Sequence, residues 1–407
     1  MSLPFYEHFG WEPEVVCVAE KYTDAALDHL LIESIPSKIK VHRVNALDKK
    51  LTSKLGLGSI ALRSLNSYRK YVNNLLKNEK FDLIYFSTTQ FPVMVLGNYW
   101  KKKFNVPYVI DMQDPWFSNY YQDKPKDQRP KKHWFSYRLN KYLEPRAIKN
   151  VDGLIAVSKA YITTLTNRYP EITRIPAAVI PFSASEVDFE IAKASALKFN
   201  LHFNKSDGNI HLLYIGRAGH DMSKAIELLF KAFRTGLEVQ YEIFNKLRFY
   251  FIGTSYAKAG TGIKTIEPVA RNYKLEKYVM EFTDRVPYYE GLYNLLNADA
   301  LIIPGSDDPS YTASKIFPYI LAAKPMLAIF KPSGSIKTIL EECNAGMFAD
   351  MDDVKNATHD IFNFLRDAAT HRLNKGTINL DGFSKYSAKT MTENQCKLFD
   401  EVVRGSH

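Results

Sequence analysis

The sequence has few cysteines and no long hydrophobic run. Its three cysteines, Cys17, Cys343 and Cys396, lie far apart in a chain of 407 residues, a spacing typical of reduced thiols and not of a disulfide framework or a zinc site. No apolar stretch approaches the ~20 residues that a membrane-spanning helix needs. Polar residues such as Glu7 and His8 stand where a signal peptide would have its apolar core. We therefore expect a cytoplasmic protein.

Several sequence patterns of common enzyme classes are also missing. The ten histidines show no spacing typical of metal ligands, and the chain has no Walker-type phosphate loop and no Ser-His-Asp order typical of a hydrolase. We therefore expect no metal and no other cofactor.

The hydrophobic pattern that is present alternates between strands and helices. Short apolar, β-rich runs are separated by segments of helical length, and runs that are apolar on successive residues are typical of parallel strands buried on both faces. The predicted strands are 15–19, 40–44, 81–86, 108–112, 153–157 and 178–181 in the first half and 211–215, 248–252, 279–282, 300–303, 326–330 and 347–349 in the second. This order predicts an α/β protein with doubly wound parallel sheets.

The two halves predict two Rossmann-like domains that face a cleft. We assign residues 1–185 to an N-terminal domain and residues 209–385 to a C-terminal domain. Residues 186–208 are polar and have no strong strand signal, so we place the interdomain linker there. We expect residues 386–403 to form a C-terminal helix that crosses back to the N-terminal domain. Open α/β sheets bind ligands beyond the carboxyl ends of their strands, so we expect the site in the cleft.

The charge of the chain is uneven. Lysine and arginine number 54 and aspartate and glutamate 44, a net charge of +10, and residues 101–150 alone hold 12 basic and 5 acidic side chains. Aromatic residues such as Trp116 and Trp134 are interleaved with these cations. This mixture suits an anionic membrane surface, a diphosphate-bearing acceptor or nucleic acid. A solvated helix face is the structural alternative. No recognised nucleic-acid-binding motif accompanies the charge, so we expect no nucleic acid as a partner.

The most informative stretch of the second half follows the strand at 211–215. Gly216 allows a sharp backbone turn, and Arg217 offers a planar fork for phosphate oxygens. Lys224 adds a second positive charge where a helix begins, and helix N-termini favour anions. The alternative for Arg217 is a surface ion pair.

A second stretch follows the strand at 300–303. Small polar residues here lead into a predicted helix, and their hydroxyl groups can cap that helix or bind an anion. The candidate residues are Ser310, Tyr311, Thr312, Ser314 and Lys315. The alternative is an ordinary helix cap with Lys315 in solvent.

In the first half, polar residues follow two predicted strands. Asp114, next to Trp116, can bind or orient an acceptor hydroxyl, and Thr88 and Gln90 follow the preceding strand and can line the same cleft. The alternative for Asp114 is a buried or capping residue in the turn before Pro115.

Taken in order, these stretches resemble the GT-B glycosyltransferases, specifically the retaining glycosyltransferase family 4, over about residues 81–350. The resemblance implies that residues 1–185 are the acceptor side and that the C-terminal domain binds a nucleotide sugar. It places Arg285, in the stretch 282–287, beside the pocket for the base. The donor-binding residues that it implies are Gly216, Arg217, Lys224, Arg285, Ser310, Tyr311, Thr312, Ser314 and Lys315.

The resemblance also implies a reaction. A sugar moves with retention and without a metal from a nucleotide-sugar donor to a glycan or lipid-linked acceptor, in cell-surface polysaccharide biosynthesis at the inner face of the membrane. Arg217, Lys224 and Lys315 are expected to stabilise the charge on the departing diphosphate. Asp114, Arg217 and Lys224 are the expected catalytic residues.

The chain departs from the family in two places. Two family glutamates, eight residues apart, align with Ser310 and Pro318, and the family's first strand and glycine-rich loop are not found ahead of residues 5–9. The first difference motivates an alternative function, a non-catalytic nucleotide-sugar-binding or degenerate GT-B protein. A nucleotide-sugar epimerase is a second alternative.

Overall fold

The computed structural model describes residues 1–23, 28–52, 58–119, 122, 125–126, 129, 133–307, 314–333, 335–373 and 378–405. The chain divides into two compact units. The N-terminal unit consists of Ser2–Leu27, Ile35–Phe182 and Lys389–His407, and the C-terminal unit of Met1, Asp28–Ser34 and Ser183–Ala388.

The N-terminal unit contains two parallel sheets. One is a pair formed by β1 (Val15–Val18) and β2 (Val41–Val44). The other has the order β3-β4-β5-β6, formed by β3 (Ile84–Ser87), β4 (Tyr108–Met112), β5 (Gly153–Ala156) and β6 (Ala177–Val179). The six strands predicted for this half are therefore all present, and they are divided between two sheets.

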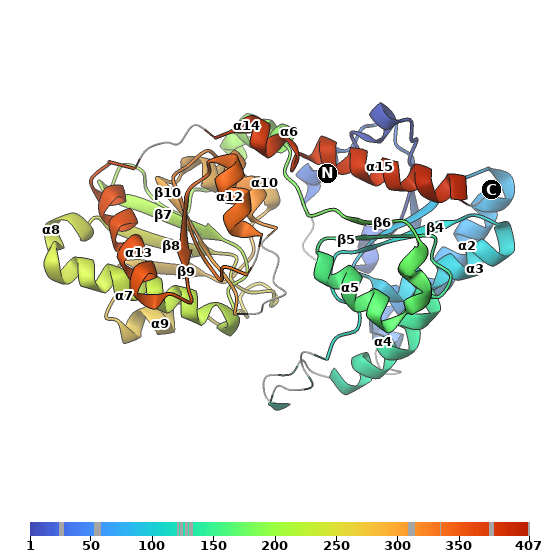
Figure 1. The fold of residues 1–407 in the computed structure, drawn as a ribbon, viewed down its shortest axis with the longest axis horizontal. Helices are drawn as coiled ribbons and strands as arrows, with labels where there is room; N and C mark the ends of the chain where they lie inside the picture. Colours follow the sequence, from blue (N-terminus) through green and yellow to red (C-terminus); the bar gives the residue numbers. More distant parts are fainter. Residues whose placement is uncertain are drawn as a thin grey trace. The chain divides into compact units, whose positions relative to one another are not determined.

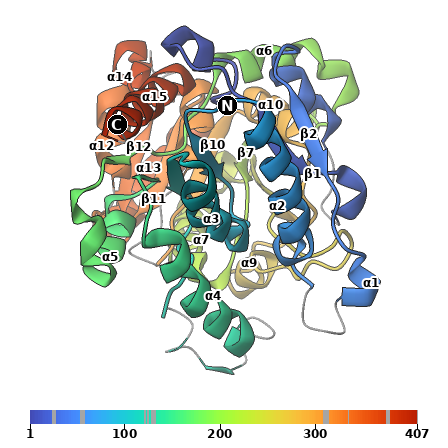
Figure 2. The ribbon, with the colours of Figure 1, turned by 90° about the vertical axis from the view of Figure 1, so that its right-hand side faces the viewer.

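Helices cover both faces of the four-stranded sheet, as Figures 1 and 2 show. Tyr108 and Ile110 of β4 pack into the apolar cluster beneath the helices of one face, whereas Val109, between them, packs with Phe399 on the other face. This alternation explains why the strand is apolar at successive residues. The first face carries α2 (Ile60–Asn78), α3 (Val95–Phe104), α4 (His133–Ile148) and α5 (Lys159–Arg168), and the other carries α15 (Ala388–Gly405).

The C-terminal unit is built around one parallel sheet of six strands, in the order β12-β11-β10-β7-β8-β9. The strands are β7 (Ile210–Ile215), β8 (Leu247–Ile252), β9 (Val279–Phe282), β10 (Ala300–Pro304), β11 (Met326–Phe330) and β12 (Met347–Asp350). The order is that of a doubly wound sheet. The chain adds β8 and β9 on one side of β7 and then returns to add β10, β11 and β12 on the other side, so the strand order reverses between β7 and β10. Such a reversal opens a crevice at the carboxyl ends of the two strands.

Helices surround this sheet (Figure 1). The longest, α7, has an apolar face whose residues, among them Ile226, Leu229 and Phe233, are fully buried, and it packs against α13. The helices of this unit are α6 (Glu186–Ala194), α7 (Ser223–Val239), α8 (Tyr241–Phe244), α9 (Glu267–Asn272), α10 (Tyr288–Asn297), α11 (Ile316–Leu321), α12 (Ile336–Cys343), α13 (Val354–Ala369) and α14 (Leu380–Ser384).

The segment 186–208, which the sequence analysis assigned to a linker, belongs to the C-terminal unit. Its helix α6 buries Phe189 and Ala192. Asp188 of the same helix accepts hydrogen bonds from the hydroxyl groups of Tyr288 (3.2 Å) and Tyr289 (3.3 Å) on α10. The helix has only a narrow apolar stripe among polar residues, so the sequence pattern did not indicate that it packs against the C-terminal unit.

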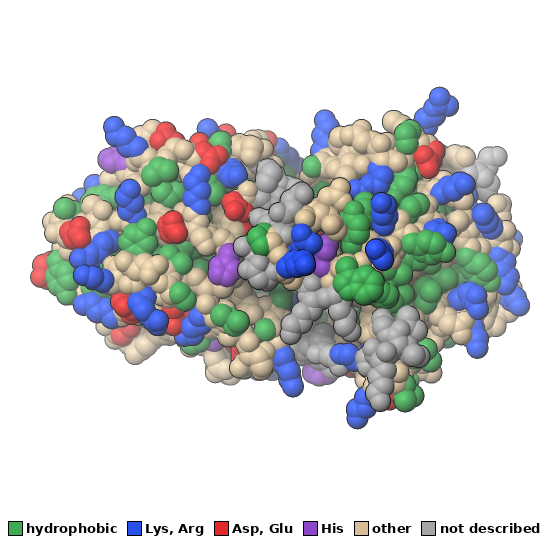
Figure 3. Space-filling model, turned by 90° about the horizontal axis from the view of Figure 1, so that it is seen from below, with side chains coloured by type: hydrophobic (Ala, Val, Ile, Leu, Met, Phe, Trp, Pro, Cys, Tyr) green, Lys and Arg blue, Asp and Glu red, His purple; other side chains and the backbone are tan. Residues whose placement is uncertain are grey.

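The surface of the N-terminal unit is rich in cations. Figure 3 shows Lys and Arg side chains lying among hydrophobic ones on this unit, at the right of the view, with few acidic side chains. Within the described residues, no helix combines the length and the apolar character that crossing a membrane requires.

Candidate functional site

The crossover between β7 and β10 brings together two glycine-containing loops. Gly216 follows β7 and has φ +144°, in the region that favours glycine. The side chain of Lys315 lies directly against Gly216, so that a Cβ atom there would overlap it. Gly305 and Ser306 follow the neighbouring strand β10. The turn predicted at Gly216 is confirmed, and its close partner is Lys315.

Arg217 is held by a carboxylate. Its Nη1 and Nη2 atoms donate to Asp221 Oδ1 (2.9 Å) and Oδ2 (2.7 Å), and Ser306 Oγ donates to Asp221 Oδ2 (2.7 Å). Burial alone would raise the pKa of Asp221, but the hydrogen bonds from Arg217 and Ser306 outweigh it and leave this pKa below its ordinary value. Asp221 therefore stays ionised and fixes the guanidinium between the two loops.

Lys315 is the second cation of the site. Its Nζ donates to the hydroxyl oxygen of Tyr214 (2.8 Å), which in turn donates to the carbonyl oxygen of Arg217 (2.6 Å). Burial lowers the pKa of Lys315 to about 7, and the positive charges of Arg217 and Arg285 act in the same direction. Near neutral pH this lysine thus has a charge that an incoming anion would stabilise.

A buried carboxylate organises the loop after β8. Glu281 is 3% exposed and accepts hydrogen bonds from Thr254 Oγ1 (2.8 Å) and from the backbone N–H groups of Thr265 (3.0 Å) and Ile266 (2.8 Å). Thr265 Oγ1 donates to the carbonyl oxygen of Ala218 (3.0 Å), which links this loop to the loop of Arg217.

Arg285 lies on the adjacent loop after β9, with its guanidinium over the ring of Tyr256 at 5.0 Å. Arg217 follows β7 and Arg285 follows β9 of the same parallel sheet, and Lys315 lies against Gly216, so all three residues lie at the carboxyl end of the sheet.

The other donor-side predictions have different outcomes. The ammonium group of Lys224 donates to Asp352 Oδ1 (2.7 Å), on the loop after β12. Ser314 lies in the turn before α11, a helix of only six residues without a side-chain cap. A helix this short has only a weak dipole, so its N-terminus does not by itself form an anion site. Ser310, Tyr311 and Thr312 lie outside the described residues.

In the N-terminal unit, polar groups gather where β3 and β4 end. The register pairs Ser87 with Asp111, and Tyr85 OH (3.0 Å) and Gln113 Nε2 (3.0 Å) donate to Asp111 Oδ2. Burial raises the pKa of Asp111 despite the hydrogen bonds that it accepts.

The acceptor-side predictions fall in and around the same loops. Asp114 is exposed, and partial desolvation raises its pKa. Thr88 Oγ1 accepts a hydrogen bond from the backbone N–H of Gln90 (3.0 Å), so Thr88 shapes the turn after β3. Trp116 is 3% exposed, stacks on Phe91 at 5.5 Å and donates from Nε1 to Asn140 Oδ1 (3.2 Å). The prediction of Trp116 as an acceptor-side residue is corrected: it packs in the core.

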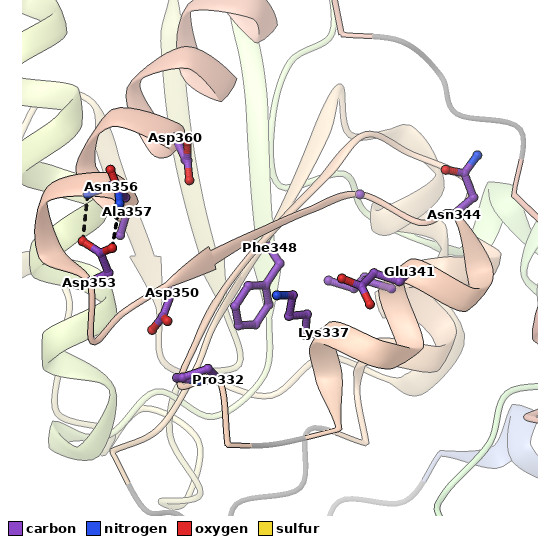
Figure 4. Close-up of a pocket in the computed structure, with 12 residues that line it drawn as sticks. Pro332, Lys337, Glu341, Asn344, Phe348, Asp350, Asp353, Asn356, Ala357 and Asp360 are labelled. Carbon is purple, nitrogen blue, oxygen red and sulfur yellow. Dashed lines mark hydrogen bonds between the residues drawn. The ribbon is translucent and has the colours of Figure 1, made fainter.

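A groove of about 620 Å³ lies elsewhere in the C-terminal unit and is lined by residues of β12, α12 and α13. Figure 4 shows its lining residues, among them Lys337, Phe348 and Asp350. None of its lining residues belongs to the group around Arg217 and Lys315. Among the described residues, no group of three or more His, Cys, Asp or Glu side chains is arranged to hold a metal ion.

Sequence reasoning missed three residues of the site, Tyr214, Asp221 and Glu281. Asp221 is four residues after Arg217, a spacing at which opposite charges often pair, and this signal was available. Glu281 is an acid within an apolar strand, which is also a signal. Tyr214 gave none, because a tyrosine in a buried strand is ordinary core.

Known proteins resemble this chain in sequence and in fold. Residues 10–181 match the family model described as Glycosyltransferase Family 4. Sucrose-phosphate synthase from Thermosynechococcus elongatus matches with a TM-score of 0.60 at 15% identity, over 98% of this chain and 91% of that chain. A comparison with curated proteins gives no match.

Two further solved structures have the same fold. A UDP-forming α,α-trehalose-phosphate synthase from Burkholderia xenovorans has a TM-score of 0.59 at 10% identity, over 96% of this chain and 94% of that chain. Anabaena Alr3699/HepE, in complex with UDP and glucose, has a TM-score of 0.55 at 14% identity, over 94% of this chain and 98% of that chain.

The chain is a glycosyltransferase of the GT-B fold. The family match covers residues 10–181 and supports the enzyme class, and the structural likeness shows the fold. The predicted fold, the resemblance to glycosyltransferase family 4 and the enzyme class are thus confirmed for this glycosyltransferase.

The desolvation of Lys315 predicts a pH-dependent cost to stability. Because the pKa is lower in the folded state than in the unfolded state, the cost is full below about pH 7 and shrinks as the pH rises towards 10.5. Lys315→Met should therefore raise the melting temperature at pH 6, by on the order of 5 °C, and less at pH 9. Lys337→Met, at an exposed lysine of α12, is the control. An equal change at both pH values would contradict the assignment.

Proposed function

We propose that this glycosyltransferase transfers a sugar from a nucleoside-diphosphate sugar to a glycan or lipid-linked acceptor, with retention and without a metal. The setting that we propose is cell-surface polysaccharide biosynthesis, in the cytoplasm at the inner face of the membrane. The donor's diphosphate lies at the carboxyl ends of β7 and β10, in contact with Arg217 and Lys315.

The observation that carries this proposal is the convergence of Arg217 and Lys315 on Gly216. Arg217 already binds a planar carboxylate, that of Asp221, through two hydrogen bonds, and phosphate oxygens suit the same guanidinium geometry. The missing side chain at Gly216 leaves room for Lys315, whose side chain lies directly against this backbone and beside the loop of Arg217. UDP in the complex of Anabaena Alr3699/HepE supports a nucleotide at this fold.

The mechanism follows from where charge develops. As the bond between the anomeric carbon and the phosphate oxygen breaks, negative charge grows on the diphosphate and positive charge on the sugar ring. Arg217 and a protonated Lys315 stabilise the departing diphosphate electrostatically, in a partly desolvated site where such interactions are strong. Lys224 strengthens the positive field from the start of α7, although its ammonium group is bound to Asp352.

On the acceptor side we propose that Asp114 orients the acceptor hydroxyl. Its carboxylate is exposed, yet partial desolvation raises its pKa, so it binds a hydroxyl hydrogen more strongly than a fully solvated carboxylate does. The nearby loop of Thr88 and Gln90 completes this side of the site.

Arg217→Ala should weaken donor binding by about 10- to 100-fold, because a charge-assisted phosphate contact contributes about 1.5–3 kcal/mol. The measurement is calorimetric titration with UDP-glucose or GDP-mannose, whichever raises the melting temperature more. Arg217→Lys should lose less, because it keeps the charge.

The matched control is Arg234→Ala on α7, which removes a partly buried arginine paired with Glu238 at 2.8 Å and should leave the affinity unchanged. Unchanged affinity in Arg217→Ala would contradict the proposed donor site.

Asp114→Asn should lower turnover by about 10-fold or more while leaving donor affinity unchanged. The carboxylate of Asp114 ionises only when the pH rises above its raised pKa. The wild-type rate should therefore rise as the pH passes this pKa, and the Asn variant should lose this rise. The assay is release of nucleoside diphosphate with a membrane lipid extract as the acceptor source. Asp82→Asn, at an exposed position of the same unit, is the control. Wild-type turnover in Asp114→Asn would remove the assignment.

A further inference from the structure

The solvent side of α4 carries only one kind of charge. The helix has a single acidic residue, Glu144, and this residue is buried, where its carboxylate pairs with Arg168 and accepts a hydrogen bond from the backbone N–H of Phe117 (3.0 Å). The exposed positions of the helix and of the residue that follows it are Trp134, Ser136, Arg138, Lys141, Tyr142, Arg146 and Lys149.

Most of these side chains form one stripe. At 100° per residue, positions 134, 138, 141, 142 and 149 fall on the same side of the helix, over a length of about 22 Å. Figure 3 views the N-terminal unit from the side on which α4 lies in Figure 1, and its hydrophobic and basic side chains lie interspersed there. We call positions 134, 138, 141, 142, 146 and 149 the α4 surface.

The aromatic side chains of the α4 surface are unusually exposed. Trp134 is 65% exposed and Tyr142 is 57% exposed. Each ring lies against a cation: the guanidinium of Arg138 is 5.7 Å from the ring centre of Trp134, and that of Arg146 is 3.3 Å from that of Tyr142. Within the described part of the chain, Arg138, Lys141 and Lys149 have no salt bridge. Tryptophan and tyrosine beside lysine and arginine is the combination that lies at a lipid headgroup layer.

The opposite side of α4 holds the proposed acceptor loop. Asn140 accepts the hydrogen bond from Trp116, and Glu144 binds the backbone of Phe117, so both contacts fix the segment that follows Asp114. One helix therefore has the proposed acceptor residue on its inner side and the cationic aromatic surface on its outer side.

We propose that the α4 surface docks this glycosyltransferase on a membrane that contains anionic lipids. The complementarity of charge selects an anionic surface, and the exposed rings select a lipid interface over a fully aqueous polyanion. The biological sense of this docking rests on the proposed lipid-linked acceptor, because docking would hold the Asp114 loop near a lipid headgroup. The physical contact itself does not depend on that reaction.

The test is co-sedimentation of the full chain with vesicles of phosphatidylcholine containing phosphatidylglycerol, and with vesicles of phosphatidylcholine alone. The wild type should bind the anionic vesicles at low salt and lose binding at high salt. Replacing Arg138, Lys141 and Lys149 with alanine should weaken the partition coefficient by about 100-fold, since each cation contributes about 1 kcal/mol. Trp134→Ser with Tyr142→Ser should also weaken binding to the anionic vesicles at low salt, although it leaves the charge unchanged.

The matched control removes three exposed lysines of the C-terminal unit, Lys198, Lys231 and Lys337, and should bind vesicles as the wild type does. Equal losses in the control and the α4 variant would show attraction by net charge alone and would overturn the proposal. Absence of wild-type binding, or binding to a DNA duplex in its place, would also overturn it. The melting-temperature shift with UDP-glucose, measured on the same variants, separates a folding defect or a failed donor site from a failed membrane surface.

Discussion

The site depends on a positive charge that the fold brings into a partly desolvated place. Lys315 lies against Gly216, next to the point where the strand order of the C-terminal sheet reverses between β7 and β10. Tyr214 accepts its hydrogen bond, and the negative charge of Asp221 acts against the effect of burial on its pKa. Without an anionic ligand this arrangement costs stability, and with a diphosphate the same charge becomes favourable. Lys315 therefore lowers the stability of the ligand-free protein and strengthens the binding of a charged ligand, as is common in sites that are preorganised for such ligands.

Asp221 supplies negative charge at the site in the absence of a ligand. Its carboxylate occupies the fork of Arg217 and accepts a hydrogen bond from Ser306, so it ties the loops after β7 and β10 together. The carboxylate has the charge and planar geometry that the guanidinium prefers, and a phosphate group offers the same features. In the N-terminal unit, Asn140 and Glu144 on the inner side of α4 hold the loop after β4, and the outer side of this helix carries cations and exposed rings.

Much of the fold could be predicted because buried parallel strands leave a strong sequence signal. All twelve predicted strands are present, since runs such as 326–330 are apolar at successive residues and are covered on both faces. The site could be predicted less well. Gly216, Arg217 and Lys315 were found from strand-to-loop positions. Asp221 and Glu281 were missed because each also binds a residue of another loop, Ser306 for Asp221 and Thr265 for Glu281, and the sequence does not show these pairings. Trp116 was misjudged because an aromatic residue in a loop gives no sign of whether it faces solvent or the core. Helix α6 was missed because its apolar stripe is narrow.

The central claim is that Lys315 gains its charge when a diphosphate binds beside Arg217. The most direct measurement is the number of protons taken up on donor binding, from calorimetric titrations with UDP-glucose at pH 8 in buffers of different ionisation enthalpy. With a pKa of about 7 in the ligand-free protein, Lys315 is mostly neutral at pH 8, so binding should take up close to one proton per site, and Lys315→Met should take up none. Donor binding without proton uptake in the wild type would contradict the account.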